Sequence, residues 1–211
     1  MSTRIKICGI TRYEDARTAA NLGVDALGFI FFNKSPRYIA PENARDIIKQ
    51  LPPFVSRVGV FVNAEASTIQ EIVRITGIDT IQLHGDESAE FCHNMPLPVI
   101  KSFSIRPDFE VSLLDSYNTA GILLDTWHDK LHGGTGKTFD WKIAGKICMK
   151  HDNVIIAGGL GPANVEDALR AVTPFGVDIN SGVEIMPGIK NPHKIRDIIR
   201  IVKSYSYSGS R

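Results

Sequence analysis

Two reactive side chains stand at the ends of short apolar segments of this sequence. Cys8 closes the segment Ile5–Cys8, and Asp125 directly follows Gly121–Leu124. Burying a carboxylate at the end of an apolar strand costs free energy unless the carboxylate is paired or takes part in function. A thiol becomes a base or nucleophile when its neighbours lower its pKa. Buried cysteine is more often a small packing residue, so it is the position of Cys8 at a segment end that favours chemistry. We therefore predict that Cys8 and Asp125 are catalytic.

Two glycine-containing turns also follow apolar segments, Gly158-Gly159 and Ser181-Gly182. With no side chain in the way, the backbone N–H groups of such turns can approach an anion closely. Each turn alone is better explained by a need for positive φ. Because both stand at the same place relative to an apolar segment, together they predict a phosphate site.

Four more polar residues are candidate ligand contacts. Arg37, in the turn Ser35-Pro-Arg-Tyr38, could clamp a carboxylate through two hydrogen bonds, although an ordinary surface ion pair fits equally well. Gln82 and His84 could touch a ligand or bond neighbouring loops, and the register of Asp178 is ambiguous. The residues alone leave these alternatives open.

One glycine-rich segment, Gly133-Gly134-Thr135-Gly136-Lys137, lacks the Gly-x-x-x-x-Gly-Lys-Ser/Thr spacing of a nucleotide-binding loop. Its glycines predict a mobile cover that closes over a bound ligand. A plain solvent loop has the same composition, so this prediction depends on where the segment lies.

The cysteines and histidines predict neither a disulfide framework nor a metal site. Three cysteines are an odd number, and their spacings are long and irregular. Cys92 and Cys148 lie in or beside helical patterns, so we interpret them as packing residues. The histidines lack pairwise metal spacing. We predict a reduced, cytoplasmic protein without a metal.

The segments that would position these groups alternate between strand and helix. Eight short runs are apolar at nearly every position, as in parallel strands buried on both faces: Ile5–Cys8, Ala26–Phe31, Val58–Val62, Thr80–Leu83, Val99–Ser102, Gly121–Leu124, Val154–Ala157 and Val177–Asn180. Helical patterns lie between them over Tyr13–Leu22, Pro41–Gln50, Ala66–Thr76, Ser88–Met95, Asn164–Val172 and Pro192–Ser204. Gly23, Gly77 and Gly176 each precede an apolar residue and an aspartate, and we predict that they end helices in a left-handed conformation.

Strict alternation with eight strands predicts an α/β fold, a (β/α)8 TIM barrel, rather than an open sheet. We expect residues 1–204 to form this barrel and residues 205–211 to be a frayed polar tail. Pro107 interrupts residues 105–118, so the fifth helix is expected to be short or irregular. Catalytic groups in such barrels come from the carboxyl ends of the strands, where the candidate residues gather.

Composition and charge narrow the class of protein. Of 211 residues, 43% are hydrophobic and 22% are charged, as in globular proteins. Lys and Arg number 24 against 23 Asp and Glu, a net charge of +1, so we expect no dedicated nucleic-acid binding. No apolar run reaches the roughly 18 residues of a membrane span, and the first residues lack the apolar core of a signal peptide. We therefore expect no membrane contact.

Taken together, these segments resemble the phosphoribosylanthranilate isomerase family, which performs an Amadori rearrangement in tryptophan biosynthesis. Nine segments spread over nearly the whole chain carry the resemblance: Lys6–Thr11, Gly28–Phe32, Lys34–Tyr38, Gly59–Val62, Gln82–Asp86, Leu124–Thr126, Gly133–Lys137, Ala157–Leu160 and Ser181–Glu184. Any one of them is a weak signal, whereas the set is highly specific.

The resemblance implies that the substrate is N-(5-phosphoribosyl)anthranilate and the product 1-(2-carboxyphenylamino)-1-deoxyribulose 5-phosphate, formed without a cofactor. It implies that Asp125 is the general acid that opens the sugar ring and that Cys8 is the general base that removes the C2 proton. Arg37 would hold the anthranilate carboxylate, the two glycine turns the phosphate, and the 133–137 loop would cover the site. Three further residues would line it: Gln82, His84 and Asp178.

Three alternatives compete with this interpretation. A related aminoimidazole ribonucleotide isomerase of histidine biosynthesis performs the same chemistry, but it resembles a design with aspartate at the position of Cys8. A non-catalytic sugar-phosphate-binding barrel would need neither Cys8 nor Asp125. A scaffold barrel would have no polar rim. The pattern leaves both a monomer and a homodimer open.

Overall fold

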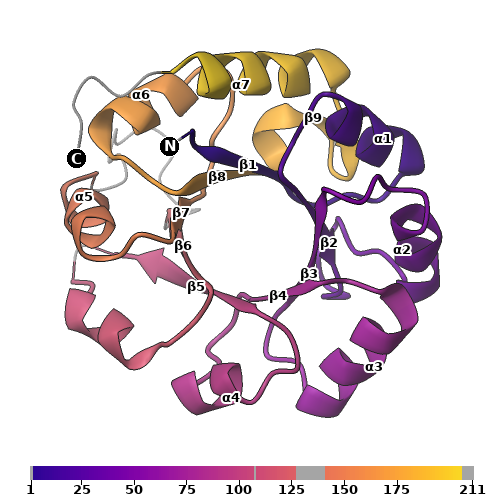
Figure 1. Cartoon of the computed structure of the whole chain (residues 1–211), viewed down its shortest axis with the longest axis horizontal. Helices are drawn as coiled ribbons and strands as arrows, with labels where there is room; N and C mark the ends of the chain where they lie inside the picture. Colours follow the sequence, from indigo (N-terminus) through magenta and orange to yellow (C-terminus); the bar gives the residue numbers. More distant parts are fainter. Residues whose placement is uncertain (1, 107, 127–140, 206–211) are drawn as a thin grey trace.

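Eight parallel strands form a closed barrel in the order β1 to β8, with the helices outside it (Figure 1). The computed structural model describes residues 2–106, 108–126 and 141–205. The strands are β1 (Arg4–Ile7), β2 (Ala26–Ile30), β3 (Ser56–Phe61), β4 (Thr80–Leu83), β5 (Val99–Ile105), β6 (Gly121–Thr126), β7 (Val154–Ile156) and β8 (Gly176–Ile179). Closure comes from the pairing of β1 with β8, in which Lys6 lies beside Asp178. The predicted (β/α)8 TIM barrel is confirmed.

Helices follow the strands along the described chain. They are α1 (Tyr13–Asn21), α2 (Pro41–Ile48), α3 (Ala66–Thr76), α4 (Ala89–His93), α5 (Trp141–Lys150), α6 (Val165–Ala171) and α7 (Pro192–Ser204). After β5 stands only the 3₁₀ helix η1 (Val111–Ser116). The expectation of a short or irregular fifth helix is therefore confirmed, and α5 contains Cys148, which was interpreted from the sequence as lying in or beside a helical pattern.

The core has two parts, because successive side chains of a strand point to opposite faces of the barrel wall. Outward side chains such as Ile5 and Ile7 are fully buried against the helices. A separate cluster fills the barrel interior with Val58, Ile100 and Leu123. Burying one such aliphatic side chain contributes roughly 1.5–3 kcal/mol, so both clusters hold the rim of the barrel in a fixed shape.

Two of the three predicted helix-ending glycines are confirmed. Gly23 and Gly77 have φ values of +86° and +71° at the ends of α1 and α3. The prediction for Gly176 is wrong, because α6 ends earlier and Gly176 begins β8. Pro174 cannot continue a helix, which explains the early end. Asp178 is thereby the third residue of β8 and not the residue that begins it.

A short antiparallel ribbon between β8 and α7 was not predicted. After the 3₁₀ helix η2 (Ser181–Val183), it comprises β9 (Glu184–Met186) and β10 (Ile189–Lys190). Gly188, with φ +81°, makes the turn between them, and its carbonyl oxygen accepts a hydrogen bond of 2.6 Å from the Thr11 hydroxyl. This bond fixes the ribbon to the loop that follows β1.

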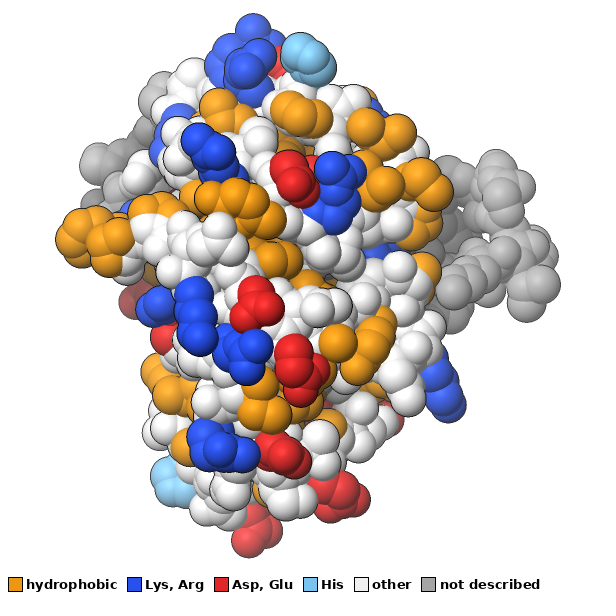
Figure 2. Space-filling model, turned by 90° about the vertical axis from the view of Figure 1, so that its right-hand side faces the viewer, with side chains coloured by type: hydrophobic (Ala, Val, Ile, Leu, Met, Phe, Trp, Pro, Cys, Tyr) orange, Lys and Arg blue, Asp and Glu red, His pale blue; other side chains and the backbone are white. Residues whose placement is uncertain are grey.

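Acidic and basic side chains are interspersed on the surface face seen in Figure 2, with no stripe of one sign. None of the described helices is long and apolar enough to cross a membrane.

Candidate active site

Cys8 directly follows β1 and lies inside the barrel, where it is only 4% exposed. Its backbone N–H donates to the carbonyl oxygen of Ile179 at 2.9 Å, which fixes its position at the rim. Gly28 on β2 leaves the space for its thiol. A Cβ at Gly28 would lie 2.8 Å from Sγ of Cys8 and 3.1 Å from Nζ of Lys6, so both groups adjoin this glycine.

A buried ion pair lies beside the thiol. Nζ of Lys6 is 2.8 Å from Oδ2 of Asp178, and both side chains are almost completely buried. Oδ1 of Asp178 is also buried and has no partner among the described residues. It can accept a hydrogen bond from a ligand, as expected of a residue that lines a site. Lys6 was not predicted as a site residue. The signal available in the sequence was a lysine between the two apolar strand residues Ile5 and Ile7.

Burial and the nearby charges act in opposite directions on this thiol. Burial raises the pKa of Cys8, the Lys6 ammonium lowers it and Asp178 raises it again, and the net result is a raised pKa. Burial alone would lower the pKa of Lys6, but Asp178 and Cys8 favour its charged form and the pKa is raised. An ordinary thiol has a pKa of about 8.5, so Cys8 is mainly protonated at neutral pH in the absence of a ligand.

Asp125 lies on β6 and is 31% exposed. Its Oδ2 is 3.2 Å from Nε2 of His84, and Nδ1 of His84 is 3.0 Å from Nε2 of Gln82. Gln82 in turn contacts the hydroxyl of Ser102 at 3.4 Å. The structure thus brings Gln82 and His84 together with Asp125 in one hydrogen-bonded chain across the adjacent strands β4, β5 and β6. This contact between β4 and β6 was not predicted.

A buried lysine fixes the loop that carries His84. Nζ of Lys101, on β5, donates to the carbonyl oxygen of Gly85 at 2.6 Å and to the carboxylate of Glu87 at 3.0 Å. The same carboxylate accepts the N–H of Gly85 at 3.0 Å. Because Gly85 directly follows His84, these bonds hold the imidazole at the rim.

The two glycine turns predicted to bind phosphate lie against each other. Gly158 and Gly159 both have positive φ, and their N–H groups have no partner among the described residues. A Cβ at Gly182 would overlap the carbonyl oxygen of Leu160, so only glycine allows this approach. The turn is held by Asn164, whose side chain bonds the N–H of residue 161 at 2.8 Å and the carbonyl oxygen of Gly159 at 3.0 Å. The two turns therefore form one surface with free backbone donors.

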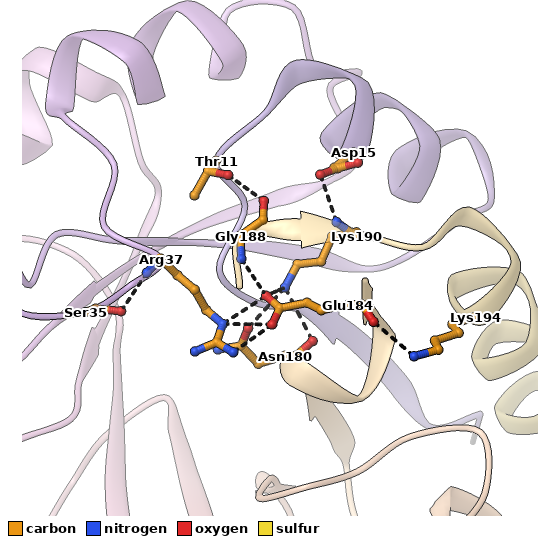
Figure 3. A network of polar contacts seen from close by, with 9 residues as sticks. All are labelled: Thr11, Asp15, Ser35, Arg37, Asn180, Glu184, Gly188, Lys190 and Lys194. Carbon is orange, nitrogen blue, oxygen red and sulfur yellow. Dashed lines mark hydrogen bonds and ion pairs between the residues drawn. The ribbon is translucent and has the colours of Figure 1, made fainter. Parts of the chain in front are cut away.

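Arg37 lies next to Cys8 at the same rim, and its guanidinium is bound by a carboxylate (Figure 3). Nε lies 2.9 and 3.1 Å from the two oxygens of Glu184, and Nη2 lies 2.6 Å from one of them. The side chain of Glu184 is only 4% exposed, so this is a buried ion pair and not a surface one. Glu184 was not predicted as a partner of Arg37.

The remaining candidates are distributed as follows. Residues 133–137, interpreted as a cover, lie outside the described residues, as does the polar tail after Tyr205. Cys92 and Cys148 are buried in the core between barrel and helices, as predicted for packing residues. In the described parts of the chain, no group of three or more His, Cys, Asp or Glu residues could hold a metal ion.

Comparisons with known proteins show what the chain as a whole is similar to. Residues 5–201 match the family model described as N-(5'-phosphoribosyl)anthranilate isomerase. A protein of that name from Syntrophus aciditrophicus is 48% identical over 96% of this chain and 88% of its own length. A phosphoribosyl anthranilate isomerase structure from Thermotoga maritima is 40% identical, with a TM-score of 0.86 over 96% of this chain and all of that one. A further isomerase structure, in complex with reduced 1-(o-carboxyphenylamino)-1-deoxyribulose 5-phosphate, is 38% identical, with a TM-score of 0.81 over 96% of this chain and all of that one.

Proposed function

The chain belongs to the N-(5′-phosphoribosyl)anthranilate isomerase family of tryptophan biosynthesis, and we propose that it rearranges this substrate by acid–base catalysis with Asp125 and Cys8. The observation that carries the proposal is their placement. Both groups stand at the carboxyl ends of barrel strands, β6 and β1, on the same rim as the glycine turns. In this fold that rim is where reactions take place.

Asp125 is the general acid. Its carboxyl group gives a proton to the ring oxygen of the ribose, the C1–O bond breaks, and the nitrogen lone pair forms the imine. The Gln82 amide donates to Nδ1 of His84, which places the imidazole proton on Nε2, toward Oδ2 of Asp125. That N–H stabilises the carboxylate left after proton transfer, and Oδ1 is the oxygen that carries the proton before it.

Cys8 is the general base. Its thiolate takes the proton from C2 of the imine and leaves an enolamine, which becomes the ketone when the C2 hydroxyl loses its proton and C1 gains one. The reaction moves protons only. The Lys6 ammonium, held by Asp178, is the positive charge that favours the thiolate in this buried place.

The remaining groups bind the substrate. Arg37 holds the anthranilate carboxylate, and Asp178 offers its free Oδ1 to a sugar hydroxyl. The backbone N–H groups of the two glycine turns hold the phosphate, because the turns lie against each other and the N–H groups of Gly158 and Gly159 have no partner among the described residues.

The site is assembled from one chain, so the proposal is the same for a monomer and for a homodimer. We propose a cytoplasmic location, because Cys8, Cys92 and Cys148, all among the described residues, form no disulfide, as is usual in a reducing compartment.

Growth of auxotrophic bacteria tests the substrate. A strain that lacks phosphoribosylanthranilate isomerase is expected to grow without tryptophan when it expresses this chain, and not when it expresses Asp125→Asn. A strain that lacks the aminoimidazole ribonucleotide isomerase is expected still to require histidine. Rescue of the second strain only, or of neither by folded protein, would contradict the proposal.

The role of Lys6 predicts a pH effect on the thiol. Because burial raises the pKa of Cys8 and Lys6 opposes this, Lys6→Met is expected to raise that pKa further. Alkylation of Cys8 by iodoacetamide, followed peptide by peptide by mass spectrometry, then needs a higher pH. Cys92 is the internal control, since its profile should not move. An unchanged profile of Cys8 in folded variant protein would show that Lys6 does not act on the thiol.

A further inference from the structure

The guanidinium of Arg37 uses only one of its edges within the protein. Glu184 occupies the edge formed by Nε and one hydrogen of Nη2. A guanidinium carries five N–H donors, so both hydrogens of Nη1 and the second of Nη2 remain, and Nη1 has no partner among the described residues. The free edge has the spacing that a carboxylate needs for two parallel hydrogen bonds.

Glu184 is fixed from its other side, so it cannot follow Arg37 if that side chain moves. Its Oε1 accepts the ammonium of Lys190 at 2.8 Å and the N–H of Gly188 at 3.1 Å (Figure 3). The Lys190 side chain is completely buried and also donates to Oδ1 of Asn180 at 3.0 Å. The direction of Arg37 is therefore set by a carboxylate that two further groups hold in place, the Lys190 ammonium and the N–H of Gly188.

The β9–β10 ribbon explains where these groups come from. Glu184 begins β9, Gly188 makes the turn and Lys190 ends β10. Asp15 of α1 accepts the backbone N–H of Lys190 at 3.0 Å, and Thr11 donates to the turn. The connection from β8 to α7 does not need an inserted ribbon to complete the barrel. The ribbon therefore has another role at the rim, which is to supply these groups.

The charges of the groups around Arg37 also affect how strongly it attracts an anion. An arginine paired with a glutamate is neutral as a unit and attracts an anion weakly. Lys190 adds a second cation to the same carboxylate. Burial lowers the pKa of this ammonium and Glu184 opposes that effect; with Lys190 protonated, the three residues together carry one net positive charge. This charge lies in a mostly buried place, where water screens it less than on the surface. Burial alone would raise the pKa of Glu184, but its bonds to Arg37 and Lys190 outweigh this and keep it ionised.

We propose that Glu184 and Lys190 are positioning residues for substrate recognition: Glu184 aims the free edge of Arg37 at the anthranilate carboxylate, and Lys190 restores the positive charge that Glu184 would cancel. This inference rests on the proposed function. The β9–β10 ribbon thereby distinguishes a substrate that carries the ring carboxylate from one that lacks it. Neither residue touches the reacting atoms.

Two stable ligands test the proposal without turnover. One is reduced 1-(o-carboxyphenylamino)-1-deoxyribulose 5-phosphate, and the other is the same compound without the carboxyl group. Calorimetry gives the two dissociation constants, and their ratio measures recognition of the carboxylate alone. We expect the wild type to bind the carboxylated ligand about 10- to 100-fold more tightly.

Glu184→Asp keeps the negative charge, but the aspartate side chain is too short to reach Arg37 while Gly188 and Lys190 hold its carboxylate. Lys190→Met removes the compensating cation. Both variants are expected to lower the ratio to within about threefold of unity, with little change for the carboxyl-free ligand. The matched control is Lys194→Met. Lys194 donates to the backbone oxygen of Glu184 at 2.9 Å and not to the Glu184 carboxylate. The ratio of the two dissociation constants for Lys194→Met should therefore stay at the wild-type value.

The outcomes separate this inference from the function on which it rests. A wild-type ratio retained in folded Glu184→Asp would overturn the positioning role, even if fully buried Lys190 does not tolerate substitution. Equal losses for both ligands would also overturn it, since they would indicate a general structural role. Wild-type protein that binds neither ligand would contradict the proposed function itself.

Discussion

Asp125→Asn is expected to lower kcat by roughly 10²- to 10⁴-fold, the usual contribution of one general acid. Asparagine has nearly the same shape as aspartate and can still contact Nε2 of His84, but it has no acidic proton for the ring oxygen. The side chain is 31% exposed and its removal leaves no buried charge, so the fold should be retained. Steady-state kinetics together with thermal unfolding provide the measurement.

Asp115→Asn is the matched control for that experiment. Asp115 lies in η1 and is about half exposed, paired with Lys150, and it has no place in the proposed reaction. Its kcat should equal that of the wild type. A kcat of Asp125→Asn within about threefold of the wild type would remove Asp125 from its role as the acid.

Cys8→Ser is expected to lower kcat by a similar roughly 10²- to 10⁴-fold. The hydroxyl is nearly isosteric with the thiol, but it does not ionise in the accessible pH range and is a poor base for a C–H proton. Because the pKa of Cys8 is raised by burial, wild-type kcat/KM should rise with pH above neutrality as the thiolate forms. The serine variant should lose this rise. A pH–rate profile of both proteins gives the two results together.

The control for that variant is Cys92→Ser, which makes the same atomic change at a buried cysteine of α4. It should lower the free energy of unfolding by roughly 1–3 kcal/mol, because a hydroxyl is buried in an apolar place, while kcat stays unchanged. If Cys8→Ser kept a wild-type kcat and the alkaline rise, another group would have to be the base.

The strands and the rim could be predicted because both depend on local sequence. A run that is apolar at every position is typical of a buried parallel strand, and polar residues directly after such runs must lie at the carboxyl edge. Cys8 and Asp125 were identified in this way. The cover assigned to residues 133–137 stays a prediction, since those residues lie outside the described part of the chain.

Hydrogen-bond and ion-pair partners on different strands could not be predicted, because they meet only when the barrel closes. Lys6 meets Asp178 only when β1 pairs with β8, 172 residues later in the chain. A lysine such as Lys101 or Lys190 usually indicates a surface position, and only the folded chain supplies the buried carboxylates that neutralise them.

The error at Gly176 has a local cause. The same pattern of glycine, an apolar residue and aspartate also occurs at Gly23 and Gly77, where the glycine ends a helix. At Gly176 the preceding proline had already ended α6, so the pattern fell inside the strand. The ribbon was missed for another reason: strands of three and two residues are too short to show an alternating pattern.

The most direct test of acid–base catalysis at this rim is the fluorescence decay of N-(5-phosphoribosyl)anthranilate, generated in the cuvette from anthranilate and phosphoribosyl pyrophosphate by a separate transferase. Anthranilate conjugates emit light, and the rearranged product should emit less. We predict fast decay with the wild type, and with Asp125→Asn a rate close to that of the spontaneous reaction. Decay by folded wild-type protein that is no faster than the spontaneous rate, or equally fast decay with the variant, would contradict the central claim.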